Sequence, residues 1–107
     1  MHHVYNKLVR DAIPEIIRQH GDTCQTEVMT EGEFQLMLRQ KLVEEAQEVV
    51  QAATERSLIT ELADLYEVVD TLLQTNSITT DLVRTEQERR REERGGFAQR
   101  IKLLWTE

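Results

Sequence analysis

The sequence predicts an all-α domain of four helices with short irregular segments at both ends. Two long stretches, 31–54 and 57–74, carry apolar residues three and four positions apart, which is the spacing of one helix face. The alternating stretch 23–29 has no clear partner strand, so we expect no substantial sheet. Because 107 residues with 39% hydrophobic side chains suffice for one modest core, we expect a single domain over 1–107. Self-association would bury apolar surface that such a core leaves exposed.

The first helix is expected over about residues 12–20, after an extended or irregular start. Asp11 is the predicted N-cap residue, since its side chain can accept a hydrogen bond from a free backbone N–H of the first turn. Pro14 falls in that turn, where its missing N–H costs little. Gly21 follows the apolar stripe and predicts the end of the helix.

The second and third helices are expected to lie side by side. Thr30 and Glu33 match a capping-box pattern at the start of the second helix, 31–54. Ser57 is the predicted N-cap of the third helix, 57–74. The loop between the two helices is short, so they should pack antiparallel with their flanks adjoining.

The fourth helix is expected over 81–94, capped by Thr79 or Thr80 and ended by the glycine pair 95–96. Its intermixed acidic and basic residues are typical of a helix that is exposed to solvent or projects from the body. The apolar residues of the last segment, 97–105, predict a tail that is docked on an apolar surface.

The net charge of −7 argues against a general binder of polymeric nucleic acid or of membrane surfaces, because phosphate binding normally requires a positive field. It does not exclude a small phosphorylated ligand that binds together with divalent ions. Cys24 is the only cysteine, which excludes an internal disulfide and fits a reducing cytoplasm. No apolar run is long enough to span a membrane and the N-terminus has no secretory apolar region, so we expect a cytoplasmic protein.

Two acidic motifs, Glu45-x-x-Glu48 and Glu61-x-x-Asp64, border the apolar stripes of the second and third helices. Residues three apart lie on one helix face, about 4.5 Å apart along the axis. Antiparallel packing would join the two motifs into one carboxylate cluster, with Glu44 on the same flank. Hard divalent cations such as Mg²⁺ bind several such oxygens. The spacing alone also fits a solvated acidic face, so a metal site and an acidic surface remain alternatives.

Basic residues stand near both ends of the chain. Lys7 and Arg10 lie near the start, and Arg94 precedes the glycine pair. Arginine can pair with phosphate oxygens and glycine permits close backbone approach, so these residues are candidates for phosphate binding. Taken alone, Arg-Gly-Gly is more often a helix end.

Four motifs occur in series along the chain. They are Tyr5-Asn-Lys-Leu-Val-Arg-Asp11-x-Ile-Pro-Glu-Ile-Ile17, Lys41-Leu-x-Glu-Glu-x-x-Glu48, Glu61-Leu-Ala-Asp64 and Arg94-Gly-Gly-Phe97. Each is weak by itself, but the four in this order cover most of the chain. Together they resemble the MazG-like nucleotide pyrophosphohydrolases, and more narrowly the small phosphoribosyl-ATP pyrophosphohydrolase-like branch described as house-cleaning enzymes.

The resemblance implies a four-helix MazG-like bundle, completed by assembly into a homodimer or a higher homo-oligomer. It implies Mg²⁺-dependent cleavage of a nucleoside triphosphate to the monophosphate and pyrophosphate, with Mn²⁺ able to substitute. The implied metal ligands are Glu45, Glu48, Glu61 and Asp64. The implied catalytic acids are Glu44 and Glu45, with Glu44 orienting the attacking water. The candidates for a phosphate clamp are Lys7, Arg10 and Arg94.

Three other functions stay open at this stage. A non-catalytic helical module would use the charged fourth helix and the apolar tail to bind a protein. A nucleotide-binding relative without activity is disfavoured, because every matched acid is present. The substrate is also open, and a phosphoribosyl nucleotide such as phosphoribosyl-ATP is one alternative to a nucleoside triphosphate.

Overall fold

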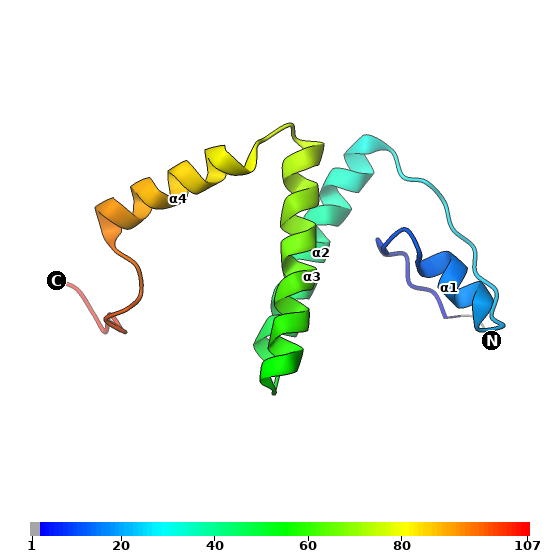
Figure 1. Ribbon diagram of the computed structural model, residues 1–107, viewed down its shortest axis with the longest axis horizontal. Helices are drawn as coiled ribbons and strands as arrows, with labels where there is room; N and C mark the ends of the chain where they lie inside the picture. Colours follow the sequence, from blue (N-terminus) through cyan, green and yellow to red (C-terminus); the bar gives the residue numbers. More distant parts are fainter. Residues whose placement is uncertain (1–2) are drawn as a thin grey trace.

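The computed structural model describes residues 3–107 and contains four helices and no strand within that range. The helices are α1 (Ile13–Gln19), α2 (Glu31–Gln51), α3 (Glu55–Thr75) and α4 (Thr80–Arg94), as Figure 1 shows. The predicted all-α class with four helices is confirmed, and every predicted boundary lies within three residues of the observed one. No helix of the described part is both long and apolar enough to cross a membrane.

Two predicted N-caps are wrong. The N-cap residue of α1 is Ala12, which makes no side-chain cap. Asp11 lies one residue before this position and does not cap the helix. α3 is capped by Thr54, whose hydroxyl accepts the Ser57 N–H at 3.1 Å, while the Ser57 hydroxyl accepts the Thr54 N–H at 3.1 Å. Ser57 therefore completes a reciprocal capping box from inside the first turn, and the helix starts earlier than the predicted boundary.

The predicted caps of α2 and α4 are confirmed, whereas α2 ends at Gln51 and not at residue 54, and Glu33 does not complete the predicted capping box. The Thr30 hydroxyl accepts the Glu33 N–H at 3.2 Å at the start of α2, and Thr79 caps α4 in the same way. Gly95 ends α4 with a φ of 82°, a left-handed conformation that glycine adopts without a steric penalty.

α2 and α3 form an antiparallel hairpin, which is the one extensive helix–helix contact among residues 3–107. Leu38 and Val68 are buried between the two helices, at 2% and 7% exposure. At the open end of the hairpin the side-chain amides of Gln35 and Asn76 exchange two hydrogen bonds of 3.1 Å. The hairpin is thus fixed by a small apolar centre and by a polar pair at one end.

α1 and α4 lie on opposite sides of this hairpin (Figure 1). The radius of gyration is 18.3 Å, whereas a compact chain of this length has about 13 Å. The predicted docking of segment 97–105 is wrong within the chain, because Phe97 is 97% exposed and Trp105 is 70% exposed. α4 carries this segment away from the hairpin, so the apolar residues meet no surface of their own chain.

The small hairpin core predicts that stability depends strongly on one buried leucine. Leu38→Ala should lower the free energy of unfolding by about 2–5 kcal/mol, because it removes a fully buried side chain and leaves a cavity. Leu36→Ala, the same substitution on the same helix at a 58% exposed position, should change it by less than about 0.5 kcal/mol. Urea unfolding followed by circular dichroism measures the free energy of unfolding of both variants. Equal losses of stability in the two variants would contradict the assignment of Leu38 to the core.

Candidate active site

The hairpin brings together three of the four predicted metal ligands. Glu45 on α2 and both Glu61 and Asp64 on α3 each place a carboxylate oxygen within 4.8 Å of the other two. Glu45 is 9% exposed and is the buried charged residue of the described chain. Its position on α2 is one turn after Lys41 and about two turns after Leu38, so the packing of the hairpin also positions the acid.

Glu48, the fourth predicted ligand, is exposed and lies outside this group of three. Its charge nevertheless acts on the cluster. Desolvation, followed by the negative charges of Glu48, Asp64 and Glu45, raises the pKa of Glu61 above its ordinary value. Four carboxylates from two helices therefore share one electrostatic environment, in which a bound cation would be favourable.

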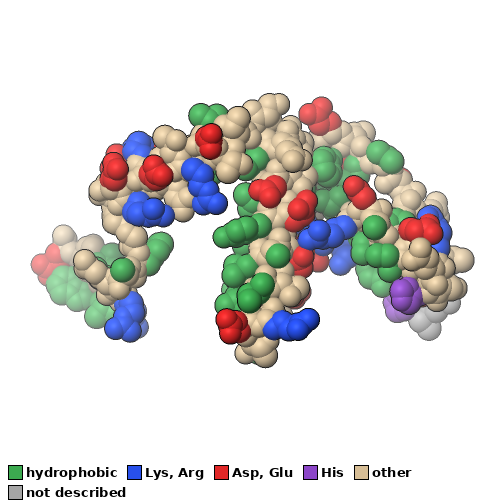
Figure 2. Space-filling model, viewed as in Figure 1, with side chains coloured by type: hydrophobic (Ala, Val, Ile, Leu, Met, Phe, Trp, Pro, Cys, Tyr) green, Lys and Arg blue, Asp and Glu red, His purple; other side chains and the backbone are tan. Residues whose placement is uncertain are grey.

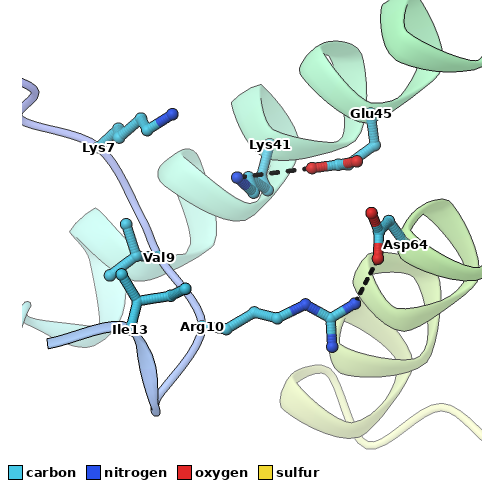
Figure 3. Close-up of a pocket in the computed structure, with 7 residues that line it drawn as sticks. All are labelled: Lys7, Val9, Arg10, Ile13, Lys41, Glu45 and Asp64. Carbon is cyan, nitrogen blue, oxygen red and sulfur yellow. Dashed lines mark hydrogen bonds and ion pairs between the residues drawn. The ribbon is translucent and has the colours of Figure 1, made fainter. Parts of the chain in front are cut away.

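Two cations partly offset the charge of the cluster. Arg10 Nη2 lies 2.8 Å from Asp64 Oδ1, across 54 residues of sequence. Lys41 Nζ lies 3.5 Å from Glu45 Oε1, one helical turn away on α2. Figure 3 shows the Lys41 side chain reaching Glu45 and the Arg10 side chain reaching Asp64. The arginine comes from the N-terminal segment and the lysine from the hairpin itself.

Glu44, the predicted catalytic acid, lies beside this group and is contacted by two lysines. Lys7 Nζ is 3.4 Å from Glu44 Oε1 and Lys41 Nζ is 3.6 Å from the same oxygen. Its side chain is 39% exposed, so water reaches it. Lys7 and Arg10 thus place the N-terminal segment directly against the acidic flank.

An open cleft of about 320 Å³ lies where the N-terminal segment meets the hairpin. It is lined by Lys7, Val9, Arg10, Ile13, Lys41, Glu45 and Asp64 (Figure 3). Sequence reasoning missed the apolar part of this lining and the role of Lys41. The signal for Lys41 was present, because it precedes Glu44 and Glu45 by three and four residues on one helix.

Arg94 is not in this cleft. It ends α4, on the other side of the hairpin from α1 (Figure 1). A larger hollow, of about 490 Å³, is lined by Glu55, Arg56, Ile59 and Thr60 from the first turns of α3 alone. It holds no cluster of acids or of cations, so the smaller cleft is the better candidate for chemistry.

The donor set suits a hard divalent cation. Glu45, Glu61 and Asp64 offer only carboxylate oxygens, and the described residues hold no Cys or His in this group. Mg²⁺ prefers such ligands and commonly bridges carboxylates to substrate phosphates. The arrangement is therefore compatible with Mg²⁺, and the facing cations are compatible with a phosphate.

Comparison with known proteins adds the family. The sequence model of one family, described as phosphoribosyl-ATP pyrophosphohydrolase, matches residues 11–91, whereas no curated protein and no solved structure matches the chain. The matched span includes all five candidate acids and excludes Lys7, Arg10 and Arg94. The resemblance noted in the sequence is confirmed. The chain belongs to the phosphoribosyl-ATP pyrophosphohydrolase family and is a pyrophosphohydrolase of the MazG-like superfamily.

Proposed function

We propose that the protein is a Mg²⁺-dependent nucleoside triphosphate pyrophosphohydrolase that converts a nucleoside triphosphate and water to the monophosphate and pyrophosphate. The observation that carries the proposal is the cluster of Glu45, Glu61 and Asp64, which Arg10 contacts through Asp64 at the edge of one cleft. Family membership supports the pyrophosphohydrolase chemistry. The lone cysteine fits action on the nucleotide pool of the cytoplasm, as a house-cleaning enzyme.

Glu45, Glu61 and Asp64 would hold the metal, with Glu48 adjacent and Mn²⁺ able to substitute. A bound divalent ion supplies charge neutralisation and polarises phosphoryl oxygens. The negative charge of these acids also repels a free triphosphate. They therefore favour a triphosphate that binds together with a cation. The substrate should therefore bind as its metal complex.

The chain's own residues perform the remaining steps. Arg10 and Lys7 are placed to contact phosphate oxygens, and the planar guanidinium can do so through two N–H groups. Glu44 would orient a water and take its proton as the water oxygen attacks the α-phosphorus. The bond from the α-phosphorus to the bridging oxygen breaks, and pyrophosphate leaves with the electron pair. Positioning and charge compensation carry this reaction.

Phosphoribosyl-ATP is the second candidate substrate, and the description of the matching family favours it. It presents the same triphosphate and would lose pyrophosphate by the same bond cleavage. The two candidates differ in the phosphoribosyl group attached to the base. One assay can therefore include both.

The first test is a substrate panel scored for pyrophosphate release. Canonical and modified nucleoside triphosphates and phosphoribosyl-ATP are each assayed with Mg²⁺, with Mn²⁺ and with a chelator. Asp64→Asn and Glu48→Gln should lower Mg²⁺-dependent turnover about 100-fold or more, because charge stabilisation by the metal is worth several kcal/mol. Glu67→Gln, an exposed acid on α3 outside the cluster, is the matched control.

Wild-type rates in the Asp64 and Glu48 variants would refute the metal assignment. Release from phosphoribosyl-ATP alone would replace the proposed substrate with the second candidate. No release from any nucleotide, together with no Mg²⁺-coupled binding of a non-hydrolysable triphosphate, would favour a non-catalytic binding module.

The Arg10–Asp64 ion pair predicts opposite effects on two ligands. Arg10 contacts an acid that the metal would need, so Arg10→Gln should tighten the binding of Mg²⁺ alone. The same substitution should weaken binding of a non-hydrolysable Mg²⁺–nucleotide, because a phosphate contact is lost. Calorimetry measures both affinities. Arg18→Gln, on an exposed arginine of α1 that pairs with Glu15, should change neither. If both affinities changed in the same direction, the proposed competition between Arg10 and Mg²⁺ for Asp64 would be wrong.

The raised pKa of Glu61 predicts how the stability of the protein and its affinity for Mg²⁺ depend on pH. Without metal, the folded state holds the Glu61 proton more tightly than the unfolded state does, so stability should fall as pH rises from the ordinary value of 4.5 to the raised pKa. Mg²⁺ competes with that proton, so its affinity should fall as pH drops through the same window. Urea unfolding and calorimetry across pH check both trends. Glu61→Gln should remove this component of the stability profile, and an unchanged profile would contradict the assignment.

A further inference from the structure

Lys41 is the basic residue of α2 that lines the cleft, and it contacts two acids with different proposed roles. Its Nζ lies 3.6 Å from Glu44 Oε1 and 3.5 Å from Glu45 Oε1. Figure 2 shows Lys and Arg side chains beside Asp and Glu side chains where the N-terminal segment meets the hairpin. An ammonium group has three donors, so one lysine can bridge two carboxylates. Lys41 therefore links the acid proposed to orient the water with an acid proposed to hold the metal.

The Lys41 side chain is largely shielded from solvent. It is 18% exposed, whereas the other two cations of the cleft, Lys7 and Arg10, are 44% and 57% exposed. Val9 and Ile13 add apolar surface to the lining of the same cleft (Figure 3). Charges interact more strongly where water screens them less. Of the three cations, Lys41 should therefore hold its acids most firmly.

The contacts on Glu44 leave one of its oxygens without a protein partner. Lys41 and Lys7 both contact Oε1, at 3.6 Å and 3.4 Å. Within residues 3–107, no hydrogen bond or ion pair involves Oε2 of Glu44. A carboxylate that is held at one oxygen keeps the other available to accept a hydrogen bond from a water. This is the geometry that a water-orienting acid needs.

A role in helix stability alone explains Lys41 poorly. Charge pairs three and four residues apart stabilise a helix best when the acid precedes the base, and here the lysine precedes both acids. Lys41 also lies near the middle of α2, whereas the helix dipole favours basic residues in the last turn, where α2 has none. The position of Lys41 is thus better explained by the acids that it contacts.

We propose that Lys41 is a positioning residue, whose ammonium holds Oε1 of Glu44 beside Glu45 so that Oε2 of Glu44 faces the attacking water. The inference rests on the proposed function and deepens it, and Lys41 needs no contact with the substrate in this role. Without the ammonium, the like charges of the two adjacent acids repel. Rotation of Glu44 into solvent relieves that repulsion, because its side chain is 39% exposed and that of Glu45 is 11% exposed.

The same ammonium opposes the binding of a metal. It lies 3.5 Å from an oxygen of Glu45, an acid that a divalent cation would also contact. Two cations beside one carboxylate repel each other, so removal of Lys41 should favour the metal while it slows the chemistry. A residue that only maintained the fold would weaken both when it was removed. Opposite effects on metal affinity and on turnover therefore distinguish positioning from a structural role.

Lys41→Met tests the role, because methionine keeps an unbranched apolar side chain and removes the charge. With the best substrate of the panel, kcat should fall at least about tenfold, since a positioned general base contributes about 100-fold or more and Glu44 is displaced, not removed. KM should change less than about twofold. Calorimetry should show Mg²⁺ alone binding about twofold to fivefold more tightly, as expected for the loss of one competing ion pair.

Three further variants complete the experiment. Lys41→Arg keeps the charge and should retain most of kcat. Arg39→Met removes the same charge from an exposed position of α2 outside the cleft, so it is the matched control and should change neither kcat nor Mg²⁺ affinity. Lys41→Gln takes the place of Lys41→Met if circular dichroism shows that methionine prevents folding.

A double variant shows whether Lys41 acts through Glu44. Lys41→Met combined with Glu44→Gln should have the same kcat as Glu44→Gln alone, because residues that act as a unit are not additive. Multiplied losses, a raised KM, weaker Mg²⁺ binding or an unchanged kcat in Lys41→Met would each overturn this inference and leave the proposed function intact. A wild-type protein without turnover of any nucleotide would refute the proposed function, and the role of Lys41 with it.

Discussion

The structure depends on holding like charges together. Two unit charges 4 Å apart repel by about 1 kcal/mol in water and by about 4 kcal/mol at the effective dielectric near a protein surface. Glu45 and Asp64 place carboxylate oxygens within 4.8 Å of each other because α2 and α3 are packed through Leu38 and Val68. Full burial of one large aliphatic side chain contributes about 1.5–3 kcal/mol, which is of the same size. The hairpin core alone therefore leaves little margin, and the counter-charges of Arg10 and Lys41 offset part of the repulsion.

This balance explains the place of the N-terminal segment. Among the described residues, its polar links to the hairpin are the ion pairs of Lys7 with Glu44 and of Arg10 with Asp64. Exposed ion pairs are weak, typically below about 1 kcal/mol, so a competing cation can displace them. The N-terminal segment therefore compensates the acids through contacts that a bound cation could replace.

Local patterns were sufficient to predict most of the fold. Helical periodicity located α2 and α3, and the short connection between them predicted that their acidic flanks adjoin. The N-cap of α3 was misplaced because Thr54 and Ser57 both have capping side chains, and only the reciprocal geometry decides between them. The Arg10–Asp64 contact could not be predicted, since nothing local links residues 54 positions apart. The exposure of the tail could not be predicted from local patterns either. It depends on the direction of α4, which the loop before α4 sets.

α3 is the element on which these features converge. Its face toward α2 carries Val68 in the core together with Glu61 and Asp64 of the acidic cluster, and its outer face carries the exposed apolar residues Ile59, Leu62, Tyr66 and Val69. Its hydrophobic surface is more than the hairpin can cover, while its acids resist close packing on their own flank. A contact on the outer face would stabilise the helix from the side opposite to the repulsion, without adding bulk to the cleft. The chain therefore combines an acidic, open site with a core of very few residues.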